Sequence, residues 1–171
     1  AYVADGYSGL QVINVSEPSN PNIIGMVNTP GDAAGITLVG QIAYVADWKS
    51  GLQVIDVSEP SNPTIIGSVD TPVYAAEIAV TDQTAYVADR HSGLQVIDIS
   101  DPSTPNIIGS LDMPGSAADI IVLDQIAYVG CWDSGLQAID VSEPSNPAII
   151  GSVNTPGPAW SIAVFDQTAY V

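Results

Sequence analysis

The sequence predicts an all-β protein built from one 42-residue unit that is repeated four times. The first observation is the period itself: the triplet Ala-Tyr-Val begins at residues 1, 43, 85, 127 and 169, without an insertion or deletion. The second is that apolar residues come in short runs broken by Gly, Pro, Asn, Asp and Ser, which is typical of short strands and turns. The third is that no amphipathic helical window occurs, and no apolar run approaches the roughly 18 residues that span a bilayer.

The unit that begins at Ala43 divides into four segments with strand character. The segment Glu59–Pro63 separates the second from the third, and its two prolines exclude a central strand because proline cannot donate to the ladder. A tight turn at Trp48–Gly51 separates the first from the second. We therefore expect strands at residues 43–47, 52–58, 64–71 and 75–80.

Four short strands per unit of this length are typical of a β-propeller blade. We predict a propeller-type array of four-stranded antiparallel blades. The small pair Ala75-Ala76 places the fourth segment at the crowded centre, followed outward by the Ala-Tyr-Val segment of the next unit and then by that unit's second and third segments. We expect the prolines and Gly67 to protect the rim strand against edge pairing.

The chain is expected to form a single array over residues 1–171. Its units are residues 1–42, 43–84, 85–126 and 127–168, and a fifth begins at 169–171. The last triplet duplicates the first, and a closed four-blade ring has no use for two copies. The chain is therefore interpreted as a window on a longer array: part of a ring of six to eight blades, half of a dimeric ring, or a stretch of an open or fibrous assembly.

Charge limits the classes of partner. Lys49 and Arg90 are the only basic side chains against 19 acidic ones, and the net charge is −17. Nucleic acids and anionic membrane surfaces bind through basic patches, so neither is expected as a partner, and no membrane insertion is expected. The single Cys131 cannot form an internal disulfide.

One recurring motif resembles a known family. It is GLQVIDVSEPSNP at residues 51–63, GLQVIDISDPSTP at 93–105 and GLQAIDVSEPSNP at 135–147. These segments closely resemble the LVIVD repeat of bacterial and archaeal surface and secreted proteins, which is thought to form β-propellers. The resemblance implies an extracellular or cell-surface repeat module, and it offers no shared catalytic residues.

The units differ mainly in two loops and in the inner strand that follows them, which a propeller would bring to one face. Exposed Trp and Tyr side chains there would stack on sugars or anchor a protein partner. The alternative is that these loops vary because nothing restrains them. The candidate ligand-binding face comprises Tyr7, Trp48, Lys49, Tyr74, Arg90, His91, Trp132, Asp133 and Trp160.

Metal binding has two candidate sources. Glu77 and Asp119 on neighbouring inner strands would line a cation-accepting channel. The aspartates that end the first and second segments, Asp47 and Asp56 among them, either accept hydrogen bonds from backbone N–H groups of their own turns or contribute ligands to calcium. No other cofactor is expected.

Catalysis has little support in the sequence. His91 lacks a partner at a triad-like or metal-like spacing, and Cys131 is either a packed thiol, a reactive thiol or an intermolecular link. We therefore predict no catalytic residues and no enzymatic activity. Asn14 lies in the one N-x-S sequon and is the candidate glycosylation site.

The functional expectation is a non-enzymatic extracellular scaffold or adhesion module that binds protein or carbohydrate through the variable face. Self-association or continuation of the array is expected as well, with a fibre or surface layer as the structural variant. The alternative is a ligand-binding propeller for carbohydrate or a cation, or an enzymatic one, and it requires polar groups that converge on the axis.

Overall fold

The computed structural model describes all residues 1–171 and contains 17 strands and no helix. The structure therefore has no helix that is long and apolar enough to cross a membrane. The strands form five antiparallel sheets: β1 (Tyr2–Ala4), β2 (Leu10–Asn14) and β3 (Asn22–Val27); β4 (Gly35–Val39), β5 (Ile42–Ala46), β6 (Leu52–Asp56) and β7 (Thr64–Val69); β8 (Glu77–Thr81), β9 (Thr84–Ala88), β10 (Leu94–Asp98) and β11 (Asn106–Leu111); β12 (Ala117–Leu123), β13 (Ile126–Cys131), β14 (Gly135–Asp140) and β15 (Ala148–Val153); β16 (Ala163–Phe165) and β17 (Thr168–Tyr170).

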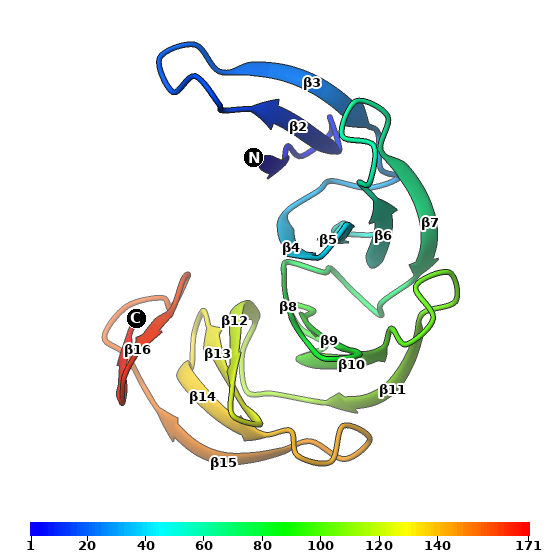
Figure 1. Cartoon of the computed structure of the whole chain (residues 1–171). Helices are drawn as coiled ribbons and strands as arrows, with labels where there is room; N and C mark the ends of the chain where they lie inside the picture. The colour runs from blue at the N-terminus through cyan, green and yellow to red at the C-terminus, as the bar shows by residue number, and fades with distance from the viewer.

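The three complete sheets have the strand orders β4-β5-β6-β7, β8-β9-β10-β11 and β12-β13-β14-β15. Strands β4, β8 and β12 lie toward the centre, and β7, β11 and β15 lie at the rim (Figure 1). The predicted all-β array and its centre-to-rim order are confirmed. The first sheet lacks an inner strand, the last has only two strands, and the two do not pair, so the chain forms an open arc rather than a closed ring (Figure 1).

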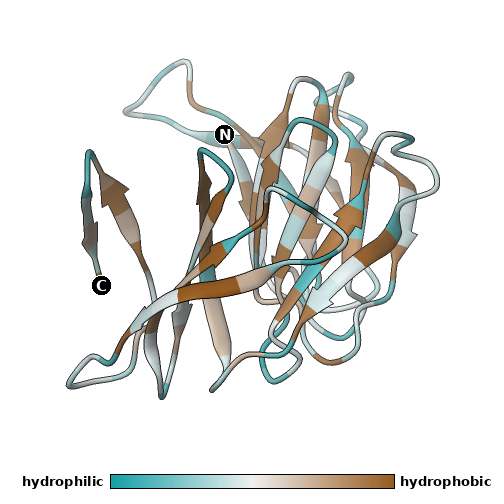
Figure 2. Cartoon of the chain, turned by 90° about the horizontal axis from the view of Figure 1, so that it is seen from below, coloured by the Kyte–Doolittle hydropathy of each residue, from teal (hydrophilic) through white to brown (hydrophobic).

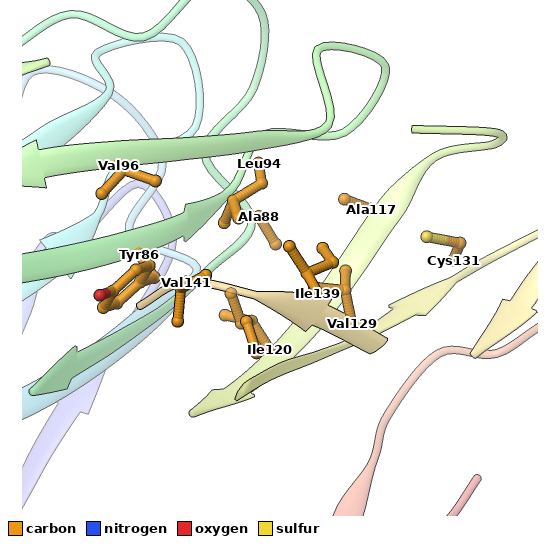
Figure 3. Packing of buried hydrophobic residues seen from close by; sticks show 11 residues of the cluster. Tyr86, Ala88, Leu94, Val96, Ala117, Ile120, Val129, Cys131, Ile139 and Val141 are labelled. Atoms are coloured by element: carbon orange, nitrogen blue, oxygen red, sulfur yellow. The ribbon is translucent and has the colours of Figure 1, made fainter. Parts of the chain in front are cut away.

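Apolar side chains on both faces of each sheet hold the array together. Along β5, Val45 faces the preceding sheet, whereas Tyr44 faces the following one, because side chains alternate along a strand. One buried cluster fills each of the three gaps between successive sheets from β1–β3 to β12–β15. In the gap before β12–β15, Leu94 of one sheet packs near Val129 and Ile139 of the next (Figure 3). The edge view shows these apolar strands between more hydrophilic loops (Figure 2).

A close backbone approach joins the rim strands β3, β7 and β11 to the next sheet. A Cβ atom at Gly67 in β7 would overlap the carbonyl oxygen of Pro102, in the proline-containing loop of the following sheet. Gly25 and Gly109 stand in the same relation to the next loop. Gly67 therefore accommodates the neighbouring sheet, a role that differs from the edge protection expected from sequence.

A buried hydrogen bond links successive sheets. The carboxylate of Asp89 accepts a bond from Thr71 Oγ1 at 2.8 Å and another from the N–H of Val73 at 3.1 Å. Asp47 accepts equivalent bonds from Thr29 and from the N–H of Gly31, and burial raises the pKa of both carboxyl groups. The prediction that these aspartates bond within their own turns was wrong, because their partners lie in the linker from the preceding sheet.

The second set of aspartates behaves as predicted. Asp56 accepts a hydrogen bond from the N–H of Ser58 at 2.8 Å, two residues ahead, and Asp98 and Asp140 do the same. These bonds lower the pKa of each carboxyl group. These aspartates thus have the first of the two roles expected from sequence, which is to accept hydrogen bonds within their own turns rather than to bind calcium.

Between the third and fourth sheets, both members of the Thr–Asp hydrogen-bonded pair are replaced. Met113 stands where the other linkers have threonine, and Cys131 stands where the other strands have aspartate. Both side chains pack in the apolar cluster between the third and fourth sheets. Burial raises the pKa of Cys131 to about 11, so the thiol remains protonated at neutral pH.

The contact at the rim glycines predicts a position-dependent cost of adding one methyl group. Gly67→Ala should lower the free energy of unfolding by about 1–3 kcal/mol through overpacking against the next loop. Gly151→Ala is the matched control, since it occupies the same position in the unit and its Cβ would meet no atom closer than Ala138 Cβ at 3.9 Å. Urea unfolding of both variants measures the difference, and equal free energies would contradict the contact.

Candidate binding site at the mouth of the array

The β5–β6 and β9–β10 loops place Trp48 and Arg90 on the same face of the array. In the first loop, the N–H of Asp47 donates to Gly51 O at 2.7 Å, and Gln53 Nε2 donates to Ser50 O at 2.7 Å. The second loop repeats both bonds, at 2.8 Å each. The buried glutamine of each unit therefore fixes the loop that carries the variable residue.

Both variable residues adopt a strained backbone conformation. Trp48 has φ 50° and Arg90 has φ 45°, in the left-handed region where side chains other than glycine cost about 1–2 kcal/mol. Gly6 occupies this position in the first unit, with φ 52°. Each strained residue also bonds to the next inner strand: Trp48 exchanges two backbone bonds with Ala75, and Arg90 O accepts one from the N–H of Ala117. Strain kept at a position where glycine would fit indicates a use for the side chain.

Five variable residues form a continuous stack, which we call the aromatic column. Tyr74 and Trp48 stack with ring centroids 4.9 Å apart and an interplanar angle of 18°. The guanidinium carbon of Arg90 lies 5.2 Å from the Trp48 ring centroid and 5.7 Å from that of Trp160. The ring centroid of Trp160 lies 4.3 Å from that of Trp132, and the two rings are tilted by 40°. The order is therefore Tyr74, Trp48, Arg90, Trp160 and Trp132.

Arg90 is the cation at the middle of the column. Its Nε atom is buried and has no hydrogen-bond partner. Burial lowers the pKa of the guanidinium, and no carboxylate opposes that effect. Trp132 is 43% exposed and Trp160 is 53% exposed, so the column is open to solvent at this end. Its chemistry suits a ligand with flat apolar faces and hydrogen-bond acceptors.

Lys49 and Tyr7 lie beside the column. Lys49 Nζ is 6.0 Å from the ring centroid of Tyr74. Tyr7 is almost fully exposed and lines a cavity of about 370 Å³ together with Trp48, Lys49 and Asp32. The cavity extends the candidate surface toward the first sheet.

The other predicted residues are not members of the column. Asp133 borders a cavity of about 250 Å³ beside Trp132, and it accepts a hydrogen bond from the N–H of Ser116 at 3.1 Å. His91 is exposed and lies next to Arg90 in the chain. Asn14 is exposed at the end of β2 and accepts a bond from the N–H of Ser16, as the aspartates at this position do in the other units.

Glu77 and Asp119 occupy the same position on neighbouring inner strands. Asp119 accepts hydrogen bonds from Ser161 Oγ at 2.9 Å and from the N–H of Ile162 at 2.7 Å. Burial, reinforced by the charge of Asp119, raises the pKa of Glu77 to about 6. No group of three or more His, Cys, Asp or Glu side chains is placed to hold a metal ion. A cation site at this pair stays a prediction.

The raised pKa of Glu77 predicts a pH-dependent stability. Protonation of Glu77 favours the folded state, so its contribution is fully present below pH ~4.5 and is lost as the pH rises through about 6. Glu77→Gln should therefore match the wild type near pH 4.5 and be more stable at pH 7, by about 1 kcal/mol after allowance for solvent screening. Denaturant unfolding at both pH values checks this, and an equal difference at both would contradict it.

Comparisons with known proteins agree with this architecture. The LVIVD repeat matches the chain four times, at residues 1–29, 30–71, 73–113 and 114–155. The last three matches each contain one complete sheet, β4–β7, β8–β11 or β12–β15. A comparison with curated protein sequences returns no match.

Two solved structures of computationally designed proteins share the fold. The Ika4 protein is 9% identical, with a TM-score of 0.68, over 83% of this chain and 85% of that one. The Ika8 protein is 9% identical, with a TM-score of 0.73, over 98% of this chain and 50% of that one, so the chain spans about half the length of Ika8. The four repeat matches cover most of the sequence, and the chain belongs to the LVIVD repeat family.

Proposed function

We propose that this chain is a non-enzymatic scaffold or adhesion module that works outside the cell and binds carbohydrate or a protein partner at the aromatic column. The observation that carries the proposal is the column itself. It gathers all three tryptophans and the single arginine of the chain on one face of the array.

The column has the properties of a recognition surface. Trp and Tyr supply large, rigid contact areas and are enriched among residues that dominate binding energy. Trp132 and Trp160 leave about half of their surface in solvent, and both lie at positions where the units differ. Trp48 and Arg90 keep strained backbones in place of the glycine that the first unit uses.

Binding is favoured over catalysis by the state of the reactive groups. The Cys131 thiol is buried and its pKa is raised, so it is a poor nucleophile. His91 is exposed and belongs to no group of side chains that could hold a metal ion. The rival function, a cation-binding or enzymatic propeller, would depend on Glu77 and Asp119 near the axis.

The proposed role of the column is tested by removing one ring. Trp160→Ala restores the alanine found at this position in the other three units, so the fold should tolerate it. Screening against an array of defined neutral and acidic oligosaccharides should find ligands of the wild type, and the variant should bind them at least about tenfold more weakly. Tyr170→Ala, exposed and outside the column, is the control. Ligands that bind both variants like the wild type would contradict the proposal.

The second part of the proposal is that the array continues into a propeller ring or a fibre through a second copy of this chain. Val3 and Val15 in the first sheet are 39% and 48% exposed, whereas their counterparts in the next three units are at most 4% exposed. In those units the preceding sheet covers the same face. The partial sheet β16–β17 carries the inner strand that the first sheet lacks. Pairing of β16 with β1 displaces β17, which is held by only three residue pairs.

Self-association should therefore depend on the exposed face of the first sheet. Sedimentation velocity of residues 1–171 at micromolar concentrations should show dimers or larger assemblies, and Val15→Lys should give monomers because a charge cannot be buried there. Ile66→Lys changes a partly exposed rim residue and is the control. A wild-type chain that stays monomeric at every concentration would overturn this part of the proposal.

A further inference from the structure

We infer that Arg90 binds the carboxylate group of an acidic sugar that rests against the aromatic column. The inference rests on the proposed binding function and names the class of ligand. It depends on the unpaired Nε atom of Arg90, on the two rings beside it and on the position of the two basic side chains of the chain.

The guanidinium group of Arg90 has a donor without an acceptor. It carries five N–H groups. The Nε atom is buried and has no hydrogen-bond partner within the chain. Buried donors in folded proteins are normally paired, and an unpaired one calls for an explanation such as an absent ligand. A ligand with acceptor oxygens would supply what the chain does not.

The enclosing rings determine how a ligand can approach. The guanidinium carbon lies 5.2 Å from the ring centroid of Trp48 and 5.7 Å from that of Trp160. The edge of the guanidinium, which carries the N–H groups, is the part that can donate hydrogen bonds to a ligand. That edge is a planar fork that matches the two oxygens of a carboxylate. The stacked rings also hold the fork in one orientation, which lowers the entropy lost on binding.

The neighbouring surface favours a sugar as the carrier of the carboxylate. Trp160 and Trp132, whose rings are tilted by 40°, extend the column away from Arg90 and remain about half exposed. A pyranose ring could lie on these indoles while its carboxylate reaches the guanidinium. An extended acidic peptide would have no comparable use for two adjacent flat rings.

The charge of the chain points to an anion of low charge. Lys49 and Arg90, the only basic side chains, both lie at or beside the column, whereas 19 acidic residues are spread over the chain, with Asp32 and Asp133 near the column. The net charge of −17 repels a densely charged polymer. It acts weakly beyond about 8 Å at physiological salt, so a single carboxylate at the column is tolerated.

Calorimetric titration of the full chain with two matched probes tests the inference. A galacturonate disaccharide should bind at least about tenfold more tightly than the corresponding neutral galactose disaccharide. Arg90→Gln should abolish this preference, and Arg90→Lys should restore only part of it because lysine keeps the charge but not the fork. Arg90→Gly copies Gly6 at the same left-handed position, so it controls for backbone strain and should also lose the preference.

The possible outcomes separate the inference from the proposed function. If both disaccharides bind equally and only Trp160→Ala weakens them, the inference is overturned and the binding function stands. If an acidic pentapeptide binds as tightly as the galacturonate probe with the same dependence on Arg90, the sugar assignment is overturned. If neither probe binds while the oligosaccharide array yields ligands sensitive to Trp160→Ala, the inference fails alone, and if the array also yields none, both fail.

Discussion

Face-to-face packing between successive sheets is the interaction on which the rest of this structure depends. Each four-stranded sheet is apolar on both faces, so a single unit would expose two surfaces that only a neighbouring unit can cover. The contrast between Val45, which is fully buried, and Val3, which is 39% exposed, shows this within one chain. As in other repeat proteins, stability is therefore the sum of unit and junction contributions, and the core lies between units.

Polar and steric contacts fix the relative position of neighbouring sheets. Apolar faces could slide over one another, whereas the bond from Thr71 to Asp89 and the approach of Pro102 to Gly67 each allow one relative position. The joint replacement of the Thr–Asp pair by Met113 and Cys131 shows that the junction tolerates an apolar solution. Replacing both partners avoids leaving a buried hydroxyl or carboxylate without a bond, which would be far more costly.

The fold could be predicted from sequence because the evidence for it is local and repeated. Small residues identified the inner strands, and the strand expected at residues 52–58 is observed at Leu52–Asp56. The partner of Asp89 could not be predicted by the same reasoning, since its hydrogen bond crosses a junction between units. Comparison of the four units placed Arg90 on the variable face. Its position near the rings of Trp48 and Trp160 depends on the curvature of the array.

The aromatic column ties recognition to the shape of the array. Its members come from successive units, and Trp48 and Arg90 also form the backbone bridges that join their sheets to the next inner strand. A change in the angle between sheets would therefore move Arg90 relative to Trp48 and Trp160 at the same time as it strains those bridges. Because the same backbone positions carry both functions, the column exists only where the junctions are intact. The residues that differ among units therefore lie on a surface that the contacts between units keep rigid.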